Sequence, residues 1–219
     1  MKRFYLLLLV IAVAGVAAIY VAGGRGDSGS RAALPIAPGD TLPMPGWTAG
    51  SDSAPVEVEE YADFECPYCA QFAVLTLPDV MQRLVQTGRV RWRFHDYVIP
   101  GHTKSPLAHE AAACAGEQGK FWEMHDHLYF NQNRWVEARN TGRLLRDYAQ
   151  QVGLDMDRYD ACVQGHKYLS RIQASGRQGS ARGVNSTPTL IIAGIIIKTV
   201  PPYDSLKALI EKATPKKKS

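Results

Sequence analysis

The chain has 219 residues, of which 46% are hydrophobic, so it can form one domain with a substantial core plus additional segments. Its net charge is only +4 at pH 7, and part of that charge lies at the ends, as in the run Lys216-Lys217-Lys218. The sequence has no basic stripe with interleaved aromatic residues, so nucleic acid binding is not expected. Four cysteines, an even number, suit an oxidising compartment.

The N-terminal segment is apolar. Lys2 and Arg3 precede an uncharged run at 4–22, which is just long enough to span a bilayer core. The basic residues in front of it predict an N-terminus inside the cell. We therefore predict a signal anchor at 1–23, with a cleaved signal peptide as the alternative because the run contains several small residues. In either case the rest of the chain lies outside the cytoplasm, in the periplasm or on the outer face of the cell membrane.

Composition divides the remainder of the chain. Residues 24–53 are rich in Gly, Ser, Pro and Ala, which predicts a flexible linker. A folded domain is predicted at 54–213, and it is followed by a basic tail at 214–219. Such a lysine run is more typical of a solvated tail than of a binding patch.

Residue periodicity predicts the first elements of the domain. Apolar residues alternate over 56–64, which indicates a strand, and then recur at three- and four-residue spacing, which indicates a helix at 67–87. Pro78 should kink this helix and Gly88 should end it. Alternation over 90–94 indicates a second, half-buried strand.

The second half of the domain begins with a helical block. Apolar stripes at helical spacing continue through 104–182. Strands are predicted at 189–193 and 195–200, and Gly194 between them indicates a tight hairpin. A closing helix carries Tyr203 and the apolar residues after it. The order of elements is strand, helix, strand, helical block, strand, strand, helix.

Two cysteines lie where the first strand pattern gives way to the helix pattern, in the run Cys66-Pro67-Tyr68-Cys69. Cys66 should stand at the helix N-terminus, where unpaired N–H groups and the helix dipole favour a negative sulfur. Pro67 tolerates a first-turn position because it has no N–H to lose. A thiolate held there reacts at neutral pH, so this arrangement indicates a redox site.

Two other uses of the cysteine pair are possible. It could form half of a zinc site, but Cys114 and Cys162 are 48 residues apart and supply no second pair at ligand spacing. It could also be a purely structural disulfide. The six histidines show no convincing metal-ligand spacing, so neither a metal nor a cofactor is expected.

Four motifs occur in order along the chain: DFECPYC at 63–69, FWEMHD at 121–126, GLD at 153–155 and GVNSTPT at 183–189. Together they resemble the DsbA-like thiol–disulfide oxidoreductases of the thioredoxin superfamily, over residues 52–213. The resemblance implies an α/β, thioredoxin-like fold with a helical insertion at about 104–182, between the second and third core strands. The order of elements described above agrees with it.

The resemblance also assigns roles around the redox pair. Cys66 is expected to be the exposed nucleophile and Cys69 its partner, one helical turn inward. Thr187-Pro188 resembles the loop whose cis-proline faces the redox pair and binds extended substrates by strand addition. Thr187, Pro188, Pro67 and Tyr68 are therefore the predicted substrate-binding residues. Strongly oxidising relatives carry histidine at the position of Tyr68, so a less extreme redox potential is expected here.

Glu60 is a predicted catalytic residue. It lies on the apolar face of the first strand together with Val58, so its carboxyl should be desolvated and its pKa raised. In relatives, an acid at this offset assists proton transfer at the second cysteine. The alternative is that Glu57, Glu59 and Glu60 form a charged edge of the sheet.

Cys114 and Cys162 are predicted to form a structural disulfide within the helical insertion. Cys114 shares an apolar stripe with Leu107, and Cys162 lies beside Val163 on the inward side of its own helix. Both should therefore face the same small core. The alternative is that they are buried free cysteines acting as small hydrophobic residues.

These features predict a membrane-tethered, monomeric oxidoreductase that introduces disulfides into exported proteins with free thiols. The resemblance implies a quinone-linked membrane partner that reoxidises it. One alternative is a reductase or isomerase on the same fold, although the linker is too short and polar for the separate dimerisation domain of dimeric isomerases. Another is a non-catalytic protein that binds unfolded peptides.

Overall fold

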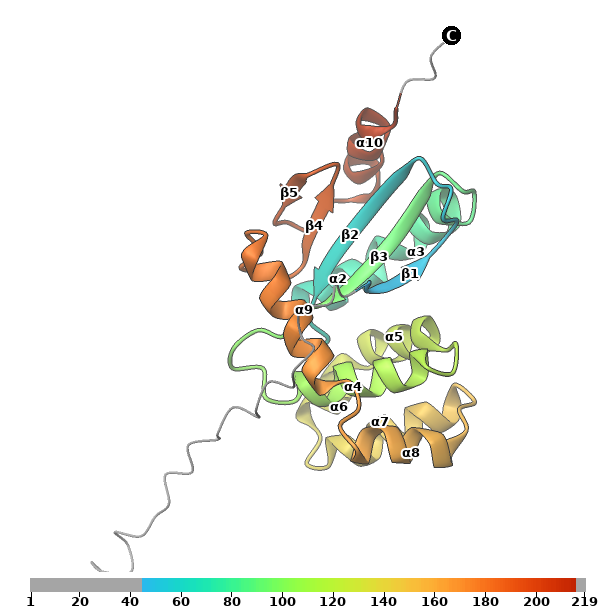
Figure 1. The fold of residues 1–219 in the computed structure, drawn as a ribbon, viewed down its shortest axis with the longest axis vertical. Helices are drawn as coiled ribbons and strands as arrows, with labels where there is room; N and C mark the ends of the chain where they lie inside the picture. The colour runs from blue at the N-terminus through green and yellow to red at the C-terminus, as the bar shows by residue number, and fades with distance from the viewer. Residues whose placement is uncertain (1–44, 216–219) are drawn as a thin grey trace, which may run out of the picture. The chain divides into compact units, whose positions relative to one another are not determined.

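The computed structural model describes residues 45–215 (Figure 1). The anchor predicted at 1–23 and most of the linker lie outside the described residues, as do the last four residues of the basic tail. Within residues 45–215, no helix combines the length and the apolar character needed to cross a membrane.

A five-stranded mixed sheet forms the centre of the domain, with strand order β1-β3-β2-β4-β5. The strands are β1 (Trp47–Ala49), β2 (Val56–Ala62), β3 (Val90–Asp96), β4 (Thr189–Ile192) and β5 (Ile195–Ile197). β2 and β3 are parallel, whereas the other neighbours are antiparallel. The alternation in the sequence is reproduced in the burial, because Val56 and Val58 are buried and the residues after each of them are half-buried.

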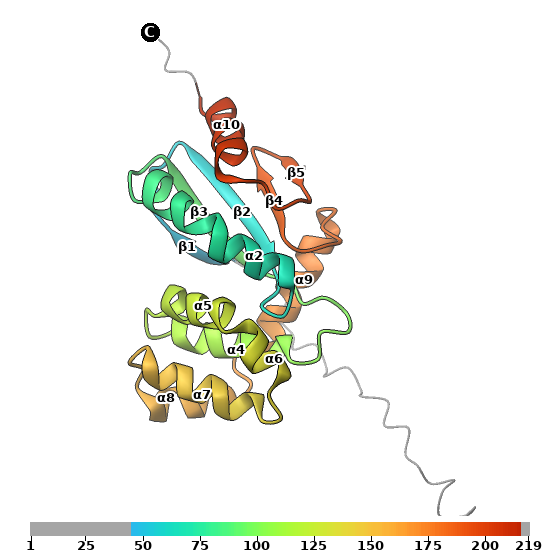
Figure 2. The same ribbon diagram turned by 180° about the vertical axis from the view of Figure 1, so that it is seen from behind.

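Helices cover one face of this sheet, as the view from behind shows (Figure 2). They are α2 (Pro67–Leu75), α3 (Leu77–Val80), the π-helical segment η1 (Met81–Val85) and α10 (Tyr203–Ala213). Phe72, Leu84 and Leu206 pack there against Val58 and Trp92 in one buried cluster. The single kinked helix predicted at 67–87 is thus three consecutive segments. The first segment, α2, ends before Thr76, close to Pro78. In an uninterrupted helix the ring of Pro78 would clash with the backbone of the preceding turn.

The folded part of the chain begins earlier than the predicted boundary at residue 54. β1 pairs antiparallel with β3, and the ring of Trp47 stacks on that of Phe121 with centroids 4.7 Å apart. Gly116 leaves room for the same indole ring, since a Cβ there would lie 2.3 Å from it. The prediction of a linker reaching residue 53 is therefore wrong. A three-residue strand is too short to show alternation, and tertiary contacts hold it.

Six helices connect β3 to β4. They are α4 (Ser105–Gly116), α5 (Phe121–Phe130), α6 (Gln132–Glu137), α7 (Thr141–Gln151), α8 (Met156–Gln164) and α9 (Leu169–Ala181). α9 lies over the end of the other sheet face (Figure 1), where Gly179 allows close contact with the ring of Tyr61. These helices form the helical insertion of a thioredoxin-like fold.

A disulfide joins Cys114 of α4 to Cys162 of α8, with the two Cα atoms 5.9 Å apart. Both residues belong to the buried cluster of the helical insertion, which also contains Leu128, Leu145 and Tyr148. The bond therefore links two helices that are far apart in the sequence but share one core.

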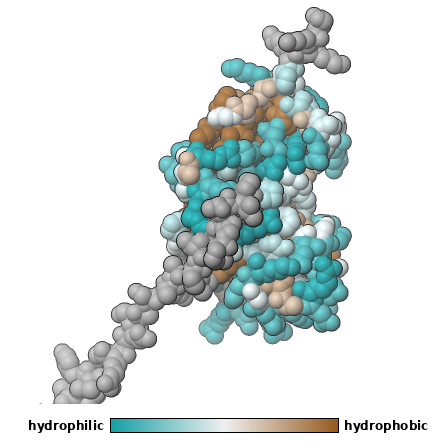
Figure 3. Space-filling model, in the orientation of Figure 1, coloured by the Kyte–Doolittle hydropathy of each residue, from teal (hydrophilic) through white to brown (hydrophobic). Residues whose placement is uncertain are grey.

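The outer strand, β5, leaves apolar side chains exposed. Ile195 and Ile196 are 56% and 39% exposed, and hydrophobic residues gather on this face over the β4–β5 hairpin (Figure 3). Ala193 and Gly194 form the tight turn of this hairpin, both with positive φ. The turn follows the sequence prediction for Gly194.

Strand register brings the two predicted halves of the redox site together. Cys66 follows the end of β2, and Thr187-Pro188 immediately precedes β4. Because β2 and β4 are antiparallel with Tyr61 opposite Thr189, the end of β2 and the start of β4 lie at the same end of the sheet. Residues 121 positions apart in the sequence thereby become neighbours.

Candidate active site

Cys66 occupies the N-cap position of α2, with extended backbone angles (φ −76°, ψ 122°), and Pro67 is the first helical residue. Its Sγ lies 3.4 Å from the carbonyl oxygen of Thr187. The residue is only 6% exposed, so the predicted exposed nucleophile is in fact largely covered.

Several donors lower the pKa of the Cys66 thiol to about 6. The largest contribution is a hydrogen bond from the Cys69 thiol, and the side chain of Thr187 and the backbone N–H groups of Tyr68 and Cys69 add to it. They outweigh burial, which acts in the opposite direction. The Thr187 hydroxyl has no hydrogen-bond partner among the described residues and is free to donate to the thiolate, whereas the Thr187 carbonyl accepts only from the protonated thiol.

Cys69 is fully buried, one helical turn further along α2. Burial raises the pKa of its thiol well above the ordinary value, and the negative charges of Cys66 and Glu60 raise it further. The two sulfurs therefore differ in charge at neutral pH, since Cys66 is a thiolate and Cys69 keeps its proton.

Glu60 is fully buried on the core face of β2 rather than part of a charged edge. Its Oε2 accepts a hydrogen bond from Trp92 Nε1 at 2.9 Å, and its Oε1 has no partner among the described residues. Burial raises the pKa of this carboxyl to about 7, although the bond from Trp92 lowers it. A group that titrates near neutrality beside Cys69 can both take and return a proton.

Two acids flank Phe64 in the loop that leads to Cys66 (63–66), here called the redox loop. The buried carboxylate of Asp63 accepts hydrogen bonds from the backbone N–H groups of Glu65 and Ile99 at 2.8 and 2.7 Å. It also accepts bonds from the side chains of His102 and Ser105. The sequence analysis assigned Asp63 no role, and the structure shows that it anchors the turn.

Glu65 anchors the same loop to α4. Its Oε2 accepts the backbone N–H groups of Lys104 and Ser105, at 2.9 and 2.8 Å, at the start of that helix. A carboxylate is favoured there because the first N–H groups of a helix lack partners within it. The redox loop and the helical insertion thus stabilise each other.

Gln132, at the start of α6, completes the support of the redox loop. Its Nε2 donates to the carbonyl oxygens of Phe64 and Cys66, at 2.7 and 2.9 Å, and the residue is buried. His109 of α4 accepts the Phe64 N–H through Nε2, at 3.5 Å, while its Nδ1 donates to Asp96 at 2.6 Å.

Sequence reasoning missed Glu65, Gln132 and His109, whose partners are far away in the chain. The one local signal was the pair of acids at 63 and 65, a pattern that suits capping and turn formation. No periodicity distinguishes Gln132 or His109 from their neighbours. Their role depends on the placement of α4 and α6 against the end of the sheet.

Of the predicted substrate-binding residues, Thr187 contacts the Cys66 sulfur, and Pro67 and Tyr68 follow Cys66 in the first turn of α2. Tyr68 is 65% exposed, Pro67 is exposed, and the Thr187–Pro188 peptide bond is cis. Between residues 45 and 215, no cluster of three His, Cys, Asp or Glu side chains could hold a metal ion.

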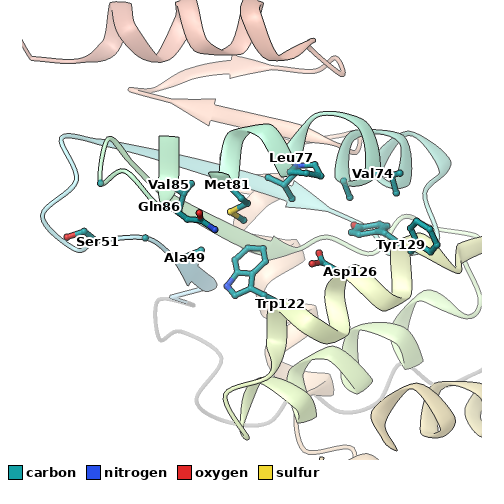
Figure 4. Close-up of a pocket in the computed structure, with 15 residues that line it drawn as sticks. Ala49, Ser51, Val74, Leu77, Met81, Val85, Gln86, Trp122, Asp126 and Tyr129 are labelled. Carbon is teal, nitrogen blue, oxygen red and sulfur yellow. The ribbon is translucent and has the colours of Figure 1, made fainter. Parts of the chain in front are cut away.

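A largely apolar groove of about 810 Å³ lies between α2–α3–η1 and α5, with Trp122 and Met81 on facing walls (Figure 4). Its end nearest the redox site is lined by Ala73, one turn after Cys69, and by Tyr129. Asp126 adds a carboxylate to the lining.

Comparisons with known proteins point to one family. The sequence profile of the family described as Thioredoxin matches residues 44–212. In the crystal structure of oxidised BdbD from Bacillus subtilis, 92% of the chain matches 78% of this one, with a TM-score of 0.69 and 26% sequence identity.

Two curated relatives differ in how much of their length is matched. The "Probable disulfide bond formation protein D" of Bacillus anthracis is 26% identical over 171 residues, which are 74% of this chain and 76% of that protein. A protein of Salinispora tropica named "Na(+)/H(+) antiporter NhaA 3" is 40% identical over 147 residues, or 66% of this chain. The match spans only about a fifth (21%) of that relative's length.

Proposed function

This chain belongs to the thioredoxin family, and we propose that it is a DsbA-like thiol–disulfide oxidoreductase that oxidises thiol pairs in exported proteins. The observation that carries the proposal is the contrast between the two sulfurs. Cys66 has a pKa of about 6 and is a thiolate at neutral pH, whereas Cys69 is buried and stays protonated. We further propose that the protein acts outside the cytoplasm, tethered by residues 4–22 and reoxidised by a quinone-linked membrane partner.

The site supports a two-step exchange. A substrate thiolate attacks Sγ of Cys66 in the oxidised site, the S–S bond breaks, and Cys69 leaves with the electron pair. Because the pKa of Cys69 is high, its thiolate takes a proton, which Glu60 can supply. The second substrate thiolate then attacks the substrate sulfur of the mixed disulfide and releases the Cys66 thiolate, which completes the substrate disulfide.

The test is the exchange of the oxidised protein with a reduced peptide that contains two cysteines. We expect one peptide disulfide for each active site, and no reaction with Cys66→Ser. The Cys66 pKa of about 6 lies between those of thioredoxin, about 7, and DsbA, about 3.5. We therefore expect a redox potential between roughly −270 and −120 mV. A potential at or below about −270 mV would indicate a reductase, and the absence of exchange would indicate a peptide-binding protein.

We expect Glu60→Gln to slow thiol exchange at pH 7–8 by roughly ten- to a hundredfold, because glutamine keeps the bond to Trp92 but cannot carry a proton. The same change should stabilise the fold. A carboxyl whose pKa rises from 4.5 to about 7 on folding favours the folded state fully only below pH 4.5. That contribution is lost as the pH rises through 7.

We therefore compare the unfolding free energy of the variant with that of the parent protein at two pH values. The difference in favour of the variant should be roughly 3 kcal/mol larger above pH 7 than at pH 4. Denaturant unfolding at pH 4 and pH 8, alongside stopped-flow exchange rates, measures both effects. Glu57→Gln, a change at a half-buried position on the same strand, is the control. Equal exchange rates for Glu60→Gln and the parent protein would remove Glu60 from the mechanism.

A further inference from the structure

We propose that Arg134 and Phe130, on the α5–α6 segment beside the redox site, form a subsite that favours substrates with an acidic side chain close to the reacting cysteine. This inference rests on the proposed oxidoreductase function and assigns it a substrate preference. The subsite is a hollow of about 430 Å³. Pro67 and Ala70 of α2 line one side of it, and residues 129–134 line the other.

The hollow is fixed in position relative to the nucleophile. Gln132, which forms part of its wall, is buried and donates to the carbonyl oxygens of Phe64 and Cys66. Pro67 follows Cys66 directly. A side chain that enters the hollow is therefore held against the same backbone that presents the reacting sulfur.

The charge of Arg134 is not neutralised. The side chain is exposed, and no carboxylate among the described residues lies within 4.0 Å of it. Several other arginines are paired with carboxylates, among them Arg91, Arg93, Arg146 and Arg182. A guanidinium presents several donors in a plane that matches a carboxylate, so an acidic side chain is its natural ligand.

Phe130 lines the hollow, and a second exposed aromatic residue, Tyr68, follows Pro67 in the chain. Phe130 is 77% exposed, the largest fraction among the exposed large hydrophobic side chains of residues 45–215, and Tyr68 is 65% exposed. They offer apolar contact to the chain that carries the acidic residue. The ligand implied is thus an extended polypeptide segment rather than a free anion.

The expected spacing follows from the geometry of an extended chain. We expect the loop at Thr187-Pro188 to hold one side of the substrate by strand addition, and the chain on the other side of the substrate cysteine to contact the hollow beside Pro67. An extended chain advances about 3.3 Å per residue. An acidic residue two or three positions from the cysteine therefore lies roughly 7–10 Å from it. Arg134 lines the same hollow as Pro67, the residue that follows Cys66.

The test uses oxidised full-length protein and reduced peptides that differ only in the residue two positions before or after the cysteine, which is Glu, Gln or Lys. At one of these positions we expect the Glu peptide to react about two- to fivefold faster than the Gln peptide. This ratio corresponds to the interaction free energy of an exposed ion pair. The Lys peptide should be slowest. The Glu preference should shrink in 1 M salt, because the Debye length falls to about 3 Å.

Variants separate the subsite from general electrostatics. Arg134→Gln should abolish the difference between the Glu and Gln peptides, and Arg134→Glu should reverse the order so that the Lys peptide is fastest. Arg139→Glu makes the same charge change at an exposed residue outside the hollow and should keep the parent order. Phe130→Ala should slow all three peptides by a similar factor.

Equal rates for the three peptides with the parent protein would overturn the subsite, and so would a change of order in Arg139→Glu as large as in Arg134→Glu. In both cases exchange itself would still occur, and the proposed function would stand. If no peptide is oxidised at all, the proposed function fails instead, and the preference fails with it.

Discussion

Replacing Cys69 with serine should convert the protein into a trap that holds its substrates as mixed disulfides on Cys66. Cys66 keeps its position at the N-cap of α2 and the donors from Thr187 and the backbone, so it still reacts as a thiolate. The bond from the Cys69 thiol is the largest of the contributions that lower its pKa, and a serine hydroxyl can replace that donor. In the variant, the Cys66 thiolate attacks a substrate disulfide, whose S–S bond breaks, so that one substrate sulfur leaves as a thiolate and the other stays bonded to Cys66. Cys69, the thiol that would attack Cys66 Sγ and release this adduct, is absent, so adducts should accumulate.

The measurement is the recovery of tagged Cys69→Ser protein from cells after acid quenching, followed by non-reducing electrophoresis. We expect bands of higher mass that disappear with reductant. The double variant Cys66→Ser/Cys69→Ser should show none, and Cys66→Ser alone should show few, because Cys69 is fully buried. A Cys69→Ser protein that forms no adducts while its Cys66 is still readily alkylated would contradict the proposed exchange mechanism.

The second large effect is expected from the bond between Cys114 and Cys162. It closes a loop across a sequence separation of 48 residues, and on the chain-entropy model such a cross-link stabilises the folded state by about 4 kcal/mol. The paired change Cys114→Ala/Cys162→Ala should lower the unfolding free energy by a similar amount. Denaturant unfolding under non-reducing conditions measures this difference.

The control for this experiment is Cys66→Ala/Cys69→Ala, which removes the other cysteine pair at a separation of only three residues. In the native protein, mild reductant should reduce the Cys66–Cys69 bond but not the Cys114–Cys162 bond, because Cys114 and Cys162 are buried in the core of the helical insertion. Mild reduction of the native protein should free two thiols, counted by alkylation after the reductant is removed and the protein is denatured, and four should appear only when the reductant is present during denaturation. A loss of less than about 1 kcal/mol in the paired alanine variant would contradict a stabilising role.

The sequence by itself determined the elements whose cause is local. Alternation placed β2 and β3, and the change from a period of two to a period of three or four placed the start of α2 at Pro67. The position of Cys66 at that start follows from the same change of period. The burial of Glu60 could also be predicted, since it shares the apolar face of β2 with Val58.

The tertiary structure decided the properties that depend on contacts between distant residues. The loop at Thr187 covers the Cys66 sulfur, which the sequence analysis expected to be exposed. β1 exists because Trp47 packs on Phe121 and pairs with β3, although its three residues carry no periodic signal. Neither contact can be read from the residues beside it in the chain.

The support of the redox loop shows the same division most clearly. Cys66 and its neighbours form a recognisable motif, but the amide that holds their backbone comes from Gln132, 66 residues later. Hydrogen bonds of this kind depend on where α6 meets the end of the sheet, and many residue types satisfy the local pattern at that position. Local periodicity specifies which face of an element is buried, whereas only the packed structure specifies which polar groups meet there.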